Sequence, residues 1–106
     1  PDDSRAYYLA GNGLVRLGER DEGVRFAERA LHIHPDEEAV LYNVACDYAL
    51  AGESERAFEC LERAVEIGFG NSSWLEIDPD LDTLRRTARF EQLVERLAAS
   101  AKPFPR

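Results

Sequence analysis

Three aspartates near the C-terminal third of the chain have a spacing found in calcium loops. Asp78, Asp80 and Asp82 alternate as the first oxygen ligands of such a loop do. The second half of the loop is missing, because Thr83 stands where a glycine is required and Arg89 where a bidentate glutamate is required. We therefore interpret these aspartates as helix-capping residues around the proline that separates the first two, and we expect no metal site.

The histidines and cysteines do not form a second ligand set. His32 and His34 are the only histidines, and a spacing of two turns their side chains about 200° apart on a helix, so they cannot share a metal. Cys46 and Cys60 lie in sequence of helical period without a CxxC motif. We expect two buried free thiols, no metal, no cofactor and a cytoplasmic location.

No group of residues has the context that catalysis requires. None of the serines lies in a nucleophile-elbow motif, and Gly11-Asn12-Gly13 falls within a helical pattern rather than a phosphate-binding loop. No pair of carboxylates lies in an apolar setting that would raise the pKa of one of them, so the carboxylates are interpreted as a solvated face. The sequence predicts a protein that is not an enzyme.

Composition and charge narrow the classes of partner. The chain has 106 residues, with 13 basic and 21 acidic side chains and a net charge of −8. A surface of this charge repels phosphates, which excludes nucleic acids and anionic membranes as expected partners. No apolar run approaches the ~20 residues of a membrane span. The chain begins at Pro1 and lacks methionine, so we expect a fragment of a longer protein.

The elements that must position these residues follow from an internal repeat of 34 residues. Matching the sequence with itself at this offset aligns identical residues across both halves of the first 70 positions. The identities are Tyr8 with Tyr42, Gly18 with Gly52, Glu19 with Glu53, Glu28-Arg29-Ala30 with Glu62-Arg63-Ala64, and Ile33 with Ile67.

Each repeated unit has the pattern of two helices. Apolar and small residues recur at intervals of three and four, as in the series Tyr7, Ala10, Gly11 and Leu14. A glycine follows the first helix of each unit, at a position where a positive φ ends a helix at low cost. Because the turns are short, the sequence predicts an all-α fold of antiparallel helix-turn-helix units, with small residues where helices approach closely.

The repeated residues resemble the tetratricopeptide repeat (TPR), whose pattern is W-x2-L-G-x2-Y, then A-x3-F, A and P at a period of 34. The match covers roughly residues 4 to 70. The first unit has Tyr7-x2-Ala10-Gly11-x2-Leu14, Gly23-x3-Ala27, Ala30 and Pro35; the second has Leu41-x2-Val44-Ala45-x2-Tyr48, Ala57-x3-Leu61, Ala64 and, in place of the proline, Phe69. The resemblance implies a TPR-like α-solenoid.

The sequence after residue 70 does not match the first two units. It predicts a short helical turn around Trp74 to Ile77, a stop at Asp78-Pro79, a second short piece at Leu81 to Leu84, and a helix of about 88 to 100 that caps the repeats. This part is similar to the degenerate last unit of TPR regions in bacterial multidomain proteins, such as class III-type adenylate cyclases and serine/threonine kinases. We expect one domain over residues 1–106, with repeats at 4–37 and 38–71, a capping unit at 72–100 and a tail at 101–106.

The resemblance implies where a partner binds. In TPR proteins the first helix of each pair lines a concave groove that accepts peptides. The corresponding residues here are Arg5, Tyr8, Asn12, Arg16, Tyr42, Asn43 and Cys46. Asn12 and Asn43 match two positions of the family's carboxylate clamp, but Tyr8 replaces its lysine, so a complete clamp is not expected.

Two functions follow as expectations. The first is a non-catalytic scaffold that binds a peptide or protein segment in the concave groove. The alternative is a structural or regulatory C-terminal appendage that packs on, or dimerises, a catalytic domain of the same polypeptide. Because two units offer limited concave area, self-association into a homo-oligomer is a further expectation.

Overall fold

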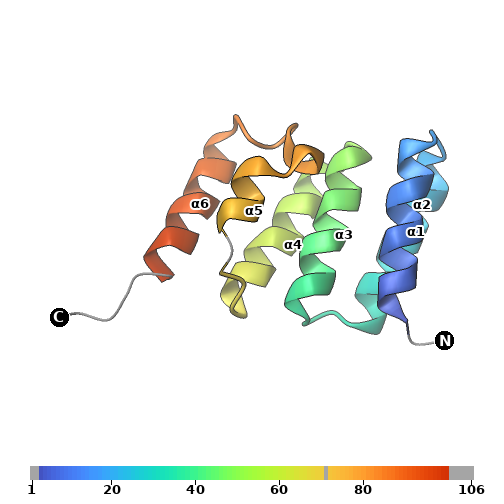
Figure 1. The fold of residues 1–106 in the computed structure, drawn as a ribbon, viewed down its shortest axis with the longest axis horizontal. Helices are drawn as coiled ribbons and strands as arrows, with labels where there is room; N and C mark the ends of the chain where they lie inside the picture. The colour runs from blue at the N-terminus through green and yellow to red at the C-terminus, as the bar shows by residue number, and fades with distance from the viewer. Residues whose placement is uncertain (1–2, 71, 101–106) are drawn as a thin grey trace.

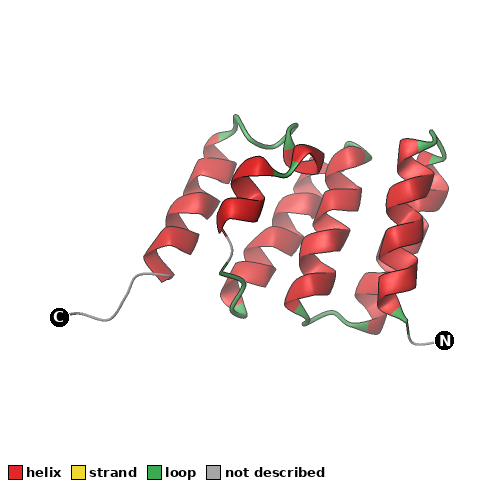
Figure 2. Ribbon diagram, in the orientation of Figure 1, coloured by secondary structure: helices red, strands yellow, loops and turns green. Residues whose placement is uncertain are grey.

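The computed structural model describes residues 3–70 and 72–100, and all regular structure within these ranges is helical (Figure 2). The all-α prediction is confirmed. The elements in chain order are α1 (Ser4–Arg16), α2 (Arg20–Ile33), α3 (Glu38–Leu50), α4 (Ser54–Glu66), α5 (Ser72–Ile77), the 3-10 helix η1 (Pro79–Leu81) and α6 (Ala88–Ser100). The predicted tail, residues 101–106, lies outside the described residues.

The helices begin at a constant interval along the chain. The first helices of the three pairs start at residues 4, 38 and 72, and the second helices start at residues 20, 54 and 88, so each start recurs after 34 residues. Sequence matching found this interval only in the first two units. The third unit therefore keeps the spacing of the helices although its residues no longer match.

Glycines end the first helices of the first two units as predicted. Gly18 has φ of +90° and Gly52 has φ of +83°, conformations that other residues avoid. In each case the next backbone N–H donates to a carbonyl five residues earlier, Glu19 to Leu14 and Glu53 to Tyr48, both at 2.8 Å. This arrangement satisfies carbonyls at the helix end and turns the chain back into an antiparallel partner.

Small residues bring the paired helices together. A Cβ atom on Gly11 would lie 2.9 Å from the carbonyl oxygen of Gly23, so α1 and α2 cross almost in backbone contact. Ala30, Ala45 and Ala64 have no exposed surface. The predicted close approach is confirmed at Gly11.

The third unit is anchored by leucines. Side chains from α5, η1, the following loop and α6 are at most 1% exposed and join the core of the first two units. They are Leu75, Leu81, Leu84, Leu93 and Leu97. The predicted helix of about 88 to 100 is confirmed in its bounds and in its buried stripe.

The helices form two rows. Figure 1 shows α1, α3 and α5 on the side nearer the viewer, with α2 and α4 behind α1 and α3. We call the surface of α1, α3, α5 and η1 the front face. Among the described residues, no helix is both long enough and apolar enough to cross a membrane.

Candidate functional site

A short acidic turn crosses the front face where α5 ends. Asp78 precedes Pro79, and a residue before proline avoids the helical conformation, so its backbone is extended with φ −69° and ψ 116°. The Asp78 carboxylate accepts a hydrogen bond from the backbone N–H of Asp80 at 3.0 Å and caps η1. The interpretation as a cap is confirmed for Asp78, whereas the carboxylates of Asp80 and Asp82 bind arginine side chains. We call residues 78–80 the acidic turn.

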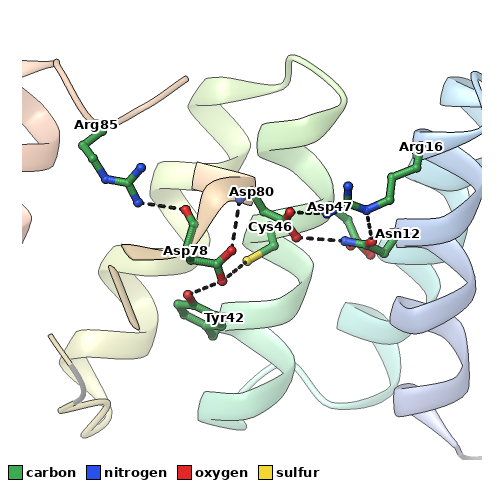
Figure 3. Close-up of polar contacts among 8 residues, drawn as sticks. All are labelled: Asn12, Arg16, Tyr42, Cys46, Asp47, Asp78, Asp80 and Arg85. Atoms are coloured by element: carbon green, nitrogen blue, oxygen red, sulfur yellow. Dashed lines mark hydrogen bonds and ion pairs between the residues drawn. The ribbon is translucent and has the colours of Figure 1, made fainter. Parts of the chain in front are cut away.

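The carboxylate of Asp78 is held by α3. Its Oδ2 accepts a hydrogen bond from the Tyr42 hydroxyl at 2.6 Å and one from the Cys46 thiol at 3.7 Å (Figure 3). The Tyr42 ring stacks on Phe69, with 5.1 Å between ring centroids. Aromatic packing thus fixes the direction in which the Tyr42 hydroxyl points.

The carboxylate of Asp80 is held by α1. Asn12 Nδ2 donates to its Oδ2 at 3.2 Å, and the Arg16 guanidinium forms an ion pair with its Oδ1. Arg16 Nε also donates to Asn12 Oδ1 at 2.8 Å, which orients the amide. The two carboxylates of the acidic turn therefore reach two different helices, as Figure 3 shows.

Asp47 lies beneath the acidic turn and is 1% exposed. Its Oδ1 accepts a hydrogen bond from the same Asn12 amide nitrogen at 3.1 Å, whereas its Oδ2 has no hydrogen-bond partner. Burial raises the pKa of Asp47 to about 7, against the opposing effect of the Asn12 hydrogen bond. The expectation that all carboxylates form a solvated face was wrong for Asp47. The signal was available, since Asp47 is the one acidic residue in the apolar second half of its helix.

The hydroxyl and thiol that hold Asp78 keep their protons. Burial raises the pKa of Tyr42 and of Cys46 far above their ordinary values, and the neighbouring carboxylates raise both further. Oxygen or sulfur atoms of Cys46, Asp78 and Asp80 lie within 4.8 Å of one another, a spacing that would suit a metal ion. The hydrogen bonds and the Arg16 ion pair already use these atoms, so the arrangement binds the turn rather than presenting free ligands.

Arg85 also holds the acidic turn, through its backbone. Its guanidinium donates to the carbonyl oxygens of Leu75 and Asp78, both at 2.8 Å, and pairs with the Asp82 carboxylate. The guanidinium carbon also lies 5.7 Å from the centre of the Phe90 ring. Arg85 thus links the end of α5, the acidic turn and the first turn of α6.

The structure brings together four of the seven residues predicted to line the groove. They are Asn12, Arg16, Tyr42 and Cys46, and all four contact the acidic turn. The other three lie apart from it. Arg5 is exposed on α1, Tyr8 is only 9% exposed and packs in the core, and Asn43 Nδ2 donates to the Ala39 carbonyl of its own helix at 2.7 Å.

Sequence reasoning assigned the residues after 71 to a cap and not to the site. The structure places Trp74 and Ile77 on α5 with exposed fractions of 51% and 74%. Together with Asp78 and Pro79 they line a shallow pocket. The front face therefore includes an aromatic and aliphatic patch beside the acidic turn.

Part of the chain is similar to part of a known protein. The chain is 34% identical over 67 residues to a protein of Arabidopsis thaliana whose name describes it as chloroplastic. The alignment covers 62% of this chain and 20% of that protein, so the chain spans about a fifth of the relative's length. No family model matches the chain, and no solved structure matches it.

Proposed function

We propose that this chain is a TPR-like repeat domain without catalytic activity, which binds a segment of another protein on its front face. One observation carries the proposal: side chains of α1 and α3 already hold the acidic turn. Asn12 and Arg16 bind it on one side, and Tyr42 and Cys46 bind it on the other. The 34-residue interval between helix starts supports the repeat architecture.

The part of the front face that remains open has the composition of a binding surface. Trp74 and Ile77 offer apolar contact area, and Arg5 and Asn43 offer polar groups at solvent-accessible positions of α1 and α3. Exposed aromatic residues and arginine are enriched where proteins bind partners. A partner segment that crosses α1, α3 and α5 would meet polar groups on the first two helices and apolar anchors on the third.

Selection from a random peptide library displayed on phage tests this proposal. Peptides selected on the wild-type chain are measured by calorimetry against the wild type, a Trp74→Ala chain and an Arg5→Glu/Asn43→Ala chain. We expect the front-face changes to weaken binding by about tenfold or more, since interface anchors contribute about 2 kcal/mol or more. Arg25→Glu on α2 is the matched control, because Arg25 is an exposed arginine of the other row. Equal affinity for all variants would contradict the proposal.

A second candidate function is an appendage that packs on another domain or dimerises it. The observation that favours it is the burial of Tyr42 and Cys46, which are 4% and 3% exposed and donate hydrogen bonds to the acidic turn. A face closed in this way stabilises the fold rather than binding a peptide. Sedimentation over a range of concentrations tests self-association: a monomer at all concentrations would count against dimerisation.

A further inference from the structure

The acidic turn contacts the front face as a bound ligand would. The hydrogen bonds from Tyr42 to Asp78 and from Asn12 to Asp80 join residues 36 and 68 positions apart in the sequence. The Asp80 carboxylate is bound by side chains of α1. The Asp78 carboxylate is bound by side chains of α3 and also accepts from the backbone N–H of Asp80 (Figure 3). The donors are a hydroxyl, a thiol, an amide and a guanidinium. All four donate hydrogen bonds to carboxylates, and the guanidinium adds a positive charge.

We propose that the surface formed by Asn12, Arg16, Tyr42 and Cys46 is a recognition site for an acidic turn of the form Asp-x-Asp, and that residues 78–80 occupy it from within the same chain. The partner that this site accepts is an acidic protein segment, one carboxylate of which displaces the Asp80 carboxylate from Asn12 and Arg16. The inference rests on the proposed function and specifies its partner and its regulation.

The Asp80 side of the site is the accessible one. The Arg16 side chain is 54% exposed and the Asp80 side chain 15% exposed, so an incoming carboxylate reaches the guanidinium from solvent. The Asp78 side is covered by the Phe69 and Trp74 rings around Tyr42. Exchange therefore begins with the Asp80 carboxylate, while Asp78 holds the turn in place.

The flanking leucines limit how far the turn moves. Leu75, Leu81 and Leu84 are at most 1% exposed, so releasing the whole of α5 and η1 would expose three buried side chains. Releasing the Asp80 carboxylate leaves these leucines in the core. Because the resident turn is tethered, its effective concentration is high, and a free peptide binds the wild-type chain weakly.

Fluorescence anisotropy with one peptide tests the proposal. The probe is a fluorescein-labelled peptide with the sequence of residues 76–82, Glu-Ile-Asp-Pro-Asp-Leu-Asp, and the proteins are the full chain as wild type, Asp80→Asn, and Asp80→Asn with Arg16→Glu. Asp82→Asn is the matched control, since Asp82 belongs to the same segment but pairs with Arg85. A peptide with asparagine in place of its first two aspartates controls for charge recognition.

We expect Asp80→Asn to bind the peptide about tenfold or more tighter than the wild type, because the competing carboxylate is removed while the turn keeps its shape. Asp82→Asn should bind as the wild type does, and Arg16→Glu should abolish the gain. Equal binding by Asp80→Asn and Asp82→Asn would overturn the inference, as would a gain that survives Arg16→Glu.

Nuclear magnetic resonance on the wild-type chain tests the inference if Asp80→Asn does not fold. Saturating peptide should then shift the side-chain N–H signals of Asn12 and Arg16, which bind Asp80, and unchanged signals would overturn the inference. The two proposals fail separately. Library peptides whose binding depends on Arg5, Asn43 or Trp74 but not on Arg16 would leave the proposed function standing and remove the acidic-turn site.

Discussion

At the scale of residues, Asn12 is the centre of the site because one amide nitrogen serves two carboxylates. It donates to Asp47 at 3.1 Å and to Asp80 at 3.2 Å, and its oxygen accepts from Arg16. The buried carboxylate of Asp47 and the acidic turn are therefore coupled through Asn12. A change in the charge of Asp47 alters the environment of Asp80 directly, as the effect of Asp80 on the pKa of Asp47 indicates.

Asp47 makes stability depend on pH near neutrality. Burial raises its pKa from the ordinary 3.8 to about 7, so between these values the folded chain binds a proton that the unfolded chain releases. The free energy of unfolding therefore falls as pH rises from about 4 to 7, by at most about 1.4 kcal/mol per pH unit from this group. Asp47→Asn removes the titrating group. Urea unfolding from pH 5 to 8 should show a smaller loss of stability with pH in this variant.

An exposed carboxylate provides the control for that measurement. Asp21 lies in the first turn of α2 and is exposed, so Asp21→Asn should leave the pH dependence between 5 and 8 as it is in the wild type. Parallel pH profiles for the wild type and Asp47→Asn would show that Asp47 is charged in the folded chain throughout this range, contrary to the account.

The sequence predicted the residues of α1 and α3 that make these contacts, but not the residues of the acidic turn that they bind. Asn12, Arg16, Tyr42 and Cys46 were identified because a repeat pattern places them on the first helices of the units. Their partners Asp78 and Asp80 follow from tertiary packing between residues 36 and 68 positions apart, which no local period encodes. The burial of Asp47 has the same origin, since its side chain contacts α1 at Asn12 and Gly11.

At the scale of elements, the acidic turn explains why the first helix of the third unit is short. α5 has 6 residues, whereas α1 and α3 have 13 each. Pro79 ends α5 by removing a backbone donor and by holding Asp78 in an extended conformation. The chain then turns across α3 instead of continuing parallel to it, which places the acidic turn on the front face.

Leu81 anchors the acidic turn to the core. It belongs to η1 and has no exposed surface, so Leu81→Ala should lower the free energy of unfolding by about 2–5 kcal/mol, as for other buried leucines. Ile77→Ala is the control, because Ile77 is 74% exposed at the end of α5 and its truncation should cost no more than about 0.5 kcal/mol. If urea denatures both variants at the same midpoint, η1 is not packed as described.

The small residues at the helix contacts lead to a second prediction, about the stability of the chain when one of them is enlarged. Ala30 of α2 has no exposed surface, so Ala30→Phe should destabilise the chain by the ~1–3 kcal/mol typical of overpacking. Ala6→Phe on the exposed side of α1 is the matched control and should have little effect. A thermal midpoint for Ala30→Phe equal to that of the control would be inconsistent with the packing of α2.

Element bounds could be predicted where apolar periodicity was strong. The terminal helix was expected at about 88 to 100 from Phe90, Leu93, Val94 and Leu97, and α6 spans Ala88–Ser100. The stop at Pro79 was also predicted, because proline acts locally. The direction that the chain takes after the stop depends on donors from α1 and α3, and it could not be read from the segment itself.

At the scale of the whole molecule, the spacing of helices is kept along the chain even where residue identity is not. Helix starts recur every 34 residues through all three pairs, although the third pair lacks the identities that link the first two. The spacing is kept although α5 is much shorter than α1 and α3, because η1 and the loop after it lie between α5 and α6. The third unit has different neighbours from the first two, because it contributes the acidic turn and is the last of the described units.

The acidic turn also connects the first unit with the third. Asp80 of the third unit pairs with Arg16 of the first, so a contact spans the second unit across the front face. Repeat proteins are usually held together by neighbouring units alone. Here an ion pair between the first and third units adds a long-range constraint on the front face.

A double-mutant cycle on Tyr42 and Asp78 tests most directly that side chains of the front face hold the acidic turn. The free energy of unfolding is measured for the wild type, Tyr42→Phe, Asp78→Ala and the double variant. A hydrogen bond to a charged group predicts a coupling energy of about 1–3 kcal/mol, with the double variant less destabilised than the sum of the single variants. Additive effects of the two substitutions would contradict the account.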